Sequence, residues 1–182
     1  MDIMNIIAKQ LSDPRVYQQL STNAGTKPQQ AQQVTQTALP MLLKALQQNA
    51  SSPEGAQSLQ NALQQHQNDP VSDLLGFFKN VDTSDGSKIL QHIFAGQQEN
   101  VQTDLANKVG LQNNQVSNLL VQLAPLVLGM LGNQQQAQGN QGTVNDLLSQ
   151  VMGMIGNQPQ QQSNQFGIMG LILGFLKKFL AK

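Results

Sequence analysis

The sequence predicts an all-α protein: a helical bundle built from a duplicated helical unit, with Gln-rich linkers and an apolar C-terminal helix. Apolar residues recur at helical spacing along most of the 182 residues, and no useful stretch alternates polar and apolar residues as a half-buried strand would. Aromatic residues make up only 4% of the chain. The core is therefore expected to consist of Leu, Ile, Val, Met and Ala, which suit helix packing.

Helix starts are indicated by a capping residue before a proline, and helix ends by a glycine. In the first half, helices are predicted near residues 3–11, from Asp13-Pro14 to Gly25, from about Pro28 and from Ser52-Pro53. A further helix starts at Asp69-Pro70, and the next follows a turn at 82–86 and ends at Gly96. The last two are a helix that ends at Gly110 and one that starts at about residue 116. Pro40 and Pro125 lie inside helical patterns, where a proline removes a hydrogen bond, so a kink or a break is expected at each.

The chain resembles itself at an offset of 85 residues. Seven residues are identical without a gap over residues 16–46, at the pairs 16/101, 20/105, 25/110, 30/115, 40/125, 43/128 and 46/131. The pairs Gly25/Gly110 and Pro40/Pro125 carry most weight, because a helix-ending glycine and a helix-interrupting proline have backbone reasons for their positions. We predict a duplicated unit, and these four are the structural residues that the sequence singles out.

Three regions are expected. The duplicated domain covers 1–132, with repeat one at about 13–66 and repeat two at about 98–155, so that the second repeat extends into the region that follows. Residues 133–165 hold two polar Gln/Asn-rich linkers around a short helix, and such linkers have little apolar surface to bury. Residues 166–182 form the apolar C-terminal helix.

The C-terminal helix is too short to cross a membrane, which takes about 20 apolar residues. Three interpretations stay open: docking on the core, self-association with glycines allowing close approach, or contact with a membrane surface through an amphipathic face. The candidate interaction residues are Gly170, Leu171, Gly174, Phe175 and Phe179.

Composition excludes several classes of function. Charged residues are only 11% of the chain and the net charge is zero, which does not favour nucleic-acid binding. The chain has no cysteine, which excludes thiol catalysis and cysteine-ligated metals. The N-terminal residues lack the pattern of a signal peptide, so we expect a cytoplasmic protein, peripheral to a membrane if the C-terminal helix binds one.

No motif for a catalytic, cofactor-binding or metal site is found. His66 and His92 lie outside any ligand motif, and the sequence holds no nucleotide loop, nucleophile elbow or carboxylate pair. We therefore expect no catalytic residue, no cofactor, no metal and no small-molecule substrate.

The segments 85–96, 105–111 and 123–132 resemble the pattern of the bacterial YidB-like family, which is catalogued as a domain of unknown function. Ala95 departs from the family pattern by separating Phe94 from Gly96. The resemblance covers about residues 10–155 and implies an all-helical fold without an assigned activity. It also implies a likeness to homeodomain helices, but the candidate recognition helices at 28–38 and 113–123 contain no arginine or lysine.

Taken together, these features predict a non-enzymatic helical scaffold or protein-interaction protein, with the chain itself as a candidate partner. Two alternatives remain: a peripheral membrane protein that acts through residues 166–182, and a weak DNA-binding helical protein.

Overall fold

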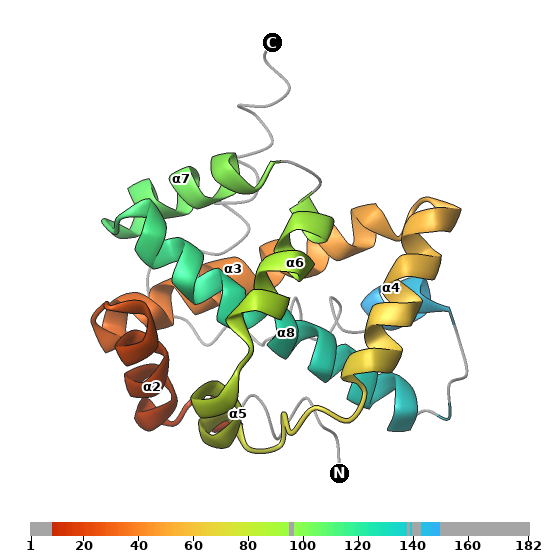
Figure 1. Ribbon diagram of the computed structural model, residues 1–182, viewed down its shortest axis with the longest axis horizontal. Coiled ribbons are helices and arrows are strands. Elements are labelled where there is room, and N and C mark those ends of the chain that lie inside the picture. Colours follow the sequence, from red (N-terminus) through yellow and green to blue (C-terminus); the bar gives the residue numbers. More distant parts are fainter. Residues whose placement is uncertain (1–8, 95–96, 138, 140–142, 150–182) are drawn as a thin grey trace, which may run out of the picture.

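The computed structural model describes residues 9–94, 97–137, 139 and 143–149. Within them lie the complete helices α2 (Pro14–Ala24), α3 (Pro28–Asn49), α4 (Pro53–His66), α5 (Leu74–Asn80), α6 (Thr83–Phe94), α7 (Gln98–Val109) and α8 (Asn113–Ala137) (Figure 1). Residues 144–149 are also helical, and the described residues contain no strand. The predicted all-α fold class is confirmed.

The residue before the first proline of each helix explains where α2 and α4 start. An Asp13 carboxylate oxygen accepts a hydrogen bond from the Arg15 backbone N–H at 2.9 Å, and the Ser52 hydroxyl accepts one from the Gly55 N–H at 3.1 Å. Each side chain satisfies a backbone donor that has no partner within the helix. Proline then follows at the first position, where its missing N–H costs nothing.

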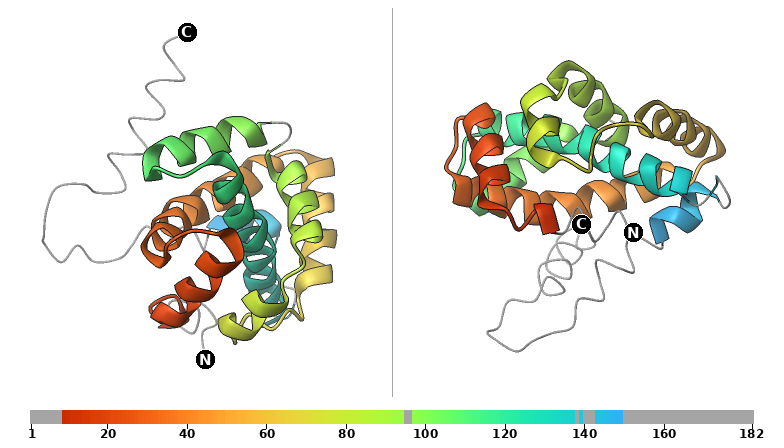
Figure 2. Two further views of the ribbon diagram at one scale, coloured as in Figure 1. Left: turned by 60° about the vertical axis from the view of Figure 1, so that its left-hand side comes forward. Right: turned by 90° about the horizontal axis from the view of Figure 1, so that it is seen from below.

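Helix α8 lies at the centre of the fold. It packs against α2, α3, α4, α6 and α7, and Figure 2 shows α3 and α6 on opposite sides of it. Residues 122–132 are buried on every side of the helix. By length and composition α8 is the one described helix that could span a membrane, but most of its apolar stretch is buried within the protein, as in the core helix of a soluble domain.

Of the kink or break expected at Pro40 and Pro125, a break is excluded, because both prolines lie inside continuous helices. A proline leaves the carbonyl four residues earlier without its N–H partner. For Pro40 that carbonyl belongs to Gln36, an exposed residue that water can reach. For Pro125 it belongs to Val121, and the backbone of Gly86 in α6 lies directly against this oxygen. Both carbonyls therefore have surroundings that let the helix continue.

Two predicted boundaries differ from the structure. Asp69-Pro70 forms a turn, with Asp73 N–H bonded to Pro70 O at 3.1 Å, and α5 starts only after Asp73. Residues 83–86 are the first turn of α6 rather than a separate turn. Asp82 precedes them, and its side chain accepts bonds from the N–H groups of Ser84 and Asp85 at 2.8 and 3.1 Å. In both places an aspartate caps the helix, and sequence alone did not say which of several aspartates would do so.

The expected linker after residue 132 begins inside α8, which continues to Ala137. Gln135 is only 7% exposed and exchanges two hydrogen bonds with Gln60 of α4, at 3.0 and 3.3 Å. Amide side chains that find such partners can be buried in a helix. The predictions for residues 3–7, Gly96, 156–165 and 166–182 lie outside the described residues.

The two halves of the fold interlock. The pair α2 and α3 comes from one predicted repeat and the pair α7 and α8 from the other; α2 packs against α8, and α7 packs against α3. Each of the two short helices, α2 and α7, thus packs on both long helices, α3 and α8, one from its own half and one from the other. This reciprocal packing is what two copies of one unit would give, while the duplication itself stays a prediction.

Candidate functional site

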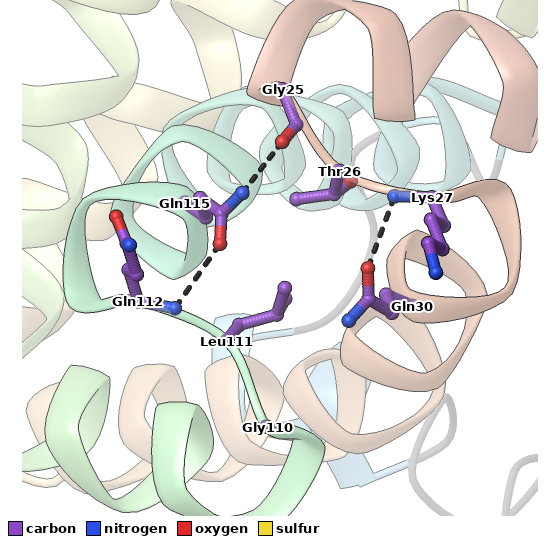
Figure 3. Close-up of a pocket in the computed structure, with 8 residues that line it drawn as sticks. All are labelled: Gly25, Thr26, Lys27, Gln30, Gly110, Leu111, Gln112 and Gln115. Atoms are coloured by element: carbon purple, nitrogen blue, oxygen red, sulfur yellow. Dashed lines mark hydrogen bonds between the residues drawn. The ribbon is translucent and has the colours of Figure 1, made fainter.

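A surface pocket of about 540 Å³ lies between the two glycine turns (Figure 3). One side consists of Gly25, Thr26, Lys27 and Gln30, and the other of Gly110, Leu111, Gln112 and Gln115. Each residue of the first set is separated from its counterpart in the second set by the same 85 residues. The pocket is therefore formed by equivalent positions of the two predicted repeats.

Each turn is set by a glycine that ends a helix. Gly25 has φ 66° and ψ 40°, and Gly110 has φ 66° and ψ 39°. This left-handed conformation is unfavourable for residues with a side chain. The Gly25 N–H donates to Ser21 O, and the Gly110 N–H donates to Ala106 O, so each glycine satisfies a helix-end carbonyl.

Two glutamines begin the helices that follow. The Gln30 side-chain oxygen accepts from the Lys27 N–H, and the Gln115 side-chain oxygen accepts from the Gln112 N–H, each at 3.1 Å. The Gln115 Nε2 also donates to Gly25 O at 2.6 Å, which ties the two turns together (Figure 3). In the sequence, Gln30 and Gln115 stand out only as an identical pair at the offset of 85 residues. Their place three residues after the helix cap was the signal that could have revealed this role.

The chemistry of the pocket is that of neutral hydrogen-bonding groups. Among the described residues that line it, Lys27 alone is charged, and none of them contributes a carboxylate, imidazole or thiol. The Thr26 hydroxyl oxygen has no hydrogen-bond partner among the described residues and is sealed from solvent, so a molecule in the pocket could not reach it. The lining provides no pair of groups for nucleophilic or acid–base chemistry.

His66 is the described titratable residue with the most carboxylate neighbours. Its Nδ1 lies 2.7 Å from an Asp69 oxygen, and its Nε2 lies 3.3 Å from an Asp85 oxygen. The two carboxylates occupy opposite sides of the ring, so they do not meet at one point with the imidazole. Among the described residues no group of three or more His, Asp and Glu side chains is placed to hold a metal ion.

A second feature emerges when equivalent positions of the two halves are compared. Val16 of α2 and Gln122, Pro125 and Leu126 of α8 are buried. Their counterparts at the same offset, Val101 of α7 and Thr37, Pro40 and Met41 of α3, are all part-exposed. We call these four residues the open face. Three of its four side chains are apolar, and the counterparts of all four are buried.

The structure brings some of the predicted residues together and separates others. Gly25 and Gly110 line one pocket, whereas Pro40 and Pro125 lie within α3 and α8, with Pro40 on the open face and Pro125 buried. The candidate interaction residues Gly170, Leu171, Gly174, Phe175 and Phe179 lie outside the described residues.

The comparisons with known proteins give one match. A family model described as "Bacterial protein of unknown function (DUF937)" matches residues 5–134. No curated protein and no solved structure gives a significant match.

Proposed function

We propose that this chain, which belongs to this bacterial family of unknown function, is a non-enzymatic helical scaffold. In this proposal it associates with protein partners, including copies of itself. The expected bacterial family of unknown function is confirmed by the match, and the YidB-like name stays an expectation.

The observation that carries the proposal is the open face. Val101 and Met41 are apolar residues that touch the core and are still part-exposed. The neighbouring open-face positions, Thr37 and Pro40, bear no charge. Apolar surface that is left partly open favours association with another protein surface.

The composition of the surface supports the same conclusion. The chain has 11% charged residues and no net charge, so copies repel one another weakly. The exposed face of α3 beside the open face is rich in glutamine, with exposed residues at Gln29, Gln32, Gln33 and Gln36. Amide side chains solvate this surface without giving it an electric field that would keep copies apart.

The test is the oligomeric state, measured by light scattering over a range of concentrations for the full chain and for a chain that lacks residues 166–182. We expect at least one form to associate, and Met41→Glu to weaken that association because it places a charge on the open face. Gln33→Glu adds the same charge at an exposed position of α3 outside the open face and is the matched control. Strictly monomeric behaviour of both forms would contradict the proposal.

A second candidate is attachment to a membrane surface through residues 166–182, in a protein that is otherwise cytoplasmic. This segment combines an apolar run with Lys177, Lys178 and Lys182. Lysines beside an apolar helix favour anionic headgroups. Flotation of the full chain with vesicles that contain anionic lipid tests it, and a chain that stays at the bottom of the gradient would remove it.

A further inference from the structure

The two sides of the pocket between the glycine turns differ in their hydrogen bonds. On one side, Gln115 caps its own helix and its Nε2 also donates to Gly25 O at 2.6 Å. On the other side, Gln30 makes the equivalent cap bond at 3.1 Å. Among the described residues, however, Gln30 Nε2 and the Gly110 carbonyl oxygen have no hydrogen-bond partner. Only one bond of this matched pair is formed within the described part of the chain.

The backbone of the two turns is the same, so the difference does not come from the turns. Gly25 and Gly110 share a φ of 66°, and their ψ angles are 40° and 39°. In each turn the next residue donates its N–H to the same helix-end carbonyl as the glycine, at 2.9 and 3.1 Å. The Gly110 carbonyl therefore leaves its turn as the Gly25 carbonyl does. Gly110 is exposed and Gln30 is part-exposed, so a molecule in the pocket can reach both.

An N–H donor beside a carbonyl acceptor matches a primary amide, which carries one group of each kind at its end. The fold satisfies such pairs with amide side chains elsewhere. The Gln10 side chain donates to Ser72 O and accepts from the Leu74 N–H. Gln60 and Gln135 exchange two bonds between their amides, at 3.0 and 3.3 Å. The donor and acceptor left in the pocket are thus groups that an amide side chain satisfies in this protein.

The rest of the lining fits a neutral amide on a short apolar chain. The volume of about 540 Å³ lies within the range of ~300–1,000 Å³ that is usual for small-ligand sites. Figure 3 shows the Leu111 side chain pointing into the space between the two turns, where it can contact methylene groups. Lys27 is exposed, so water solvates its ammonium group and the pocket does not require an anionic ligand.

We propose that this pocket binds a primary carboxamide, with Gln30 Nε2 donating to the amide oxygen and the Gly110 carbonyl accepting from the amide nitrogen. The group is either the side-chain end of a glutamine or asparagine in a second copy of the chain, or a free small amide. A second copy offers exposed glutamines on the same helix as Gln30, at Gln29, Gln32 and Gln33. That source rests on the proposed function, whereas the amide site itself does not.

Titration of the full ¹⁵N-labelled chain with propionamide, followed by NMR, tests the site. We expect saturable shifts of the Gln30 side-chain N–H signals and of the backbone N–H signals of Leu111 and Gln112. Butan-2-one has the same size and carbonyl but no N–H, so it leaves the Gly110 carbonyl without a partner. It should bind about tenfold more weakly, as should propionate, which also lacks the N–H donor.

Gln30→Glu separates binding from folding. A glutamate oxygen can still accept from the Lys27 N–H, so the helix cap is kept, but the carboxylate has no N–H to donate to the ligand. We expect this variant to bind propionamide about tenfold more weakly than the natural chain. Gln33→Glu adds the same charge at an exposed position of α3 outside the pocket and should bind as the natural chain does. Circular dichroism checks that both variants keep their helices.

The outcomes separate this proposal from the proposed function. The amide site is overturned if propionamide gives no saturable shift at the pocket, if butan-2-one or propionate binds as well, or if Gln30→Glu binds unchanged. Association that Met41→Glu weakens would then still support the proposed function. If propionamide binds, dilution of the natural chain without it identifies the source. Pocket signals that move on dilution, and do not in Gln30→Glu, support an amide from a second copy. Unmoved signals overturn that source and support a free amide.

Discussion

Gly25 and Gly110 show how much of this fold depends on the backbone of single residues. A side chain added at either position would meet no atom within 4 Å, so space does not explain the glycines. The explanation is the positive φ of 66° at both positions, which an L-residue adopts at a cost of about 1–2 kcal/mol. Each turn changes the direction of the chain between a short helix, α2 or α7, and the long helix on which it packs, α3 or α8.

Because backbone strain explains the glycine, two substitutions at Gly25 are expected to differ in the stability that they lose. Gly25→Ala is expected to lower the free energy of unfolding by about 1–2 kcal/mol, because alanine is strained at this φ. Gly25→Asn should lose less, since asparagine visits the left-handed region more readily. Urea unfolding followed by circular dichroism measures both. Equal losses would show that the turn depends on something other than backbone strain.

Tyr17 is the only tyrosine of the chain, and it is 7% exposed on the buried face of α2. Burial raises the pKa of Tyr17, because the phenolate is poorly solvated inside the protein. The folded protein therefore holds this proton more tightly than the unfolded chain. The resulting stability is present below pH ~10, the ordinary value for tyrosine, and is lost as the pH rises above it.

An ultraviolet absorbance titration of the full chain reports Tyr17 alone. We expect its midpoint to lie above that of the urea-unfolded chain. Tyr17→Phe should reduce the loss of stability at alkaline pH. A midpoint that is the same in folded and unfolded chains would contradict the burial of this side chain.

At the scale of elements, the contact between α6 and α8 depends on a proline in one helix and a glycine in the other. Pro125 frees the Val121 carbonyl of α8, and a side chain on Gly86 would overlap with this oxygen. The absence of a side chain lets α6 approach α8 closely, and a Cα–H group can then face the free carbonyl. Gly86 therefore sets the distance between two helices of the core.

Gly86→Ala is expected to reduce the free energy of unfolding by about 1–3 kcal/mol, because the added methyl pushes α6 from α8. Without that contact, alanine would stabilise the helix relative to glycine. The sign of the change in the free energy of unfolding therefore shows whether α6 approaches α8 closely at Gly86. Ser84→Ala, at an exposed position of the same turn, is the control. Thermal unfolding measures both variants, and a more stable Gly86→Ala protein would refute the close approach.

At the scale of the whole molecule, the interlocked halves share one core. Helix α2 contributes Leu20 and α7 contributes Leu105, each of them no more than 1% exposed, and both helices pack on α3 and α8. Neither half can bury its apolar residues without the other. Unfolding of one half would therefore expose the core of both.

The described fold is accordingly expected to unfold in one cooperative step. Tyr17 fluorescence reports the first half, and circular dichroism reports the helices of both halves. Their urea transitions should coincide. If Tyr17 became exposed well before the helical signal fell, the halves would be unfolding separately and the shared core would not govern stability.

The sequence by itself determined the all-α class, the segments that become α2, α3, α4 and α7, and the glycines at both turns. These depend on apolar spacing, caps and backbone conformation, which are local properties. The starts of α5 and α6 depend on local caps, Asp73 and Asp82, which the sequence did not single out among several aspartates. The continuation of α8 to Ala137 and its uninterrupted course at Pro125 were decided by tertiary structure. Each depends on a partner distant in sequence, Gln60 for Gln135 and Gly86 for the Val121 carbonyl. Likewise, the pocket and the open face exist only once α2 and α7 have packed across the two halves. No local sequence pattern predicts which long helix α2 or α7 packs on.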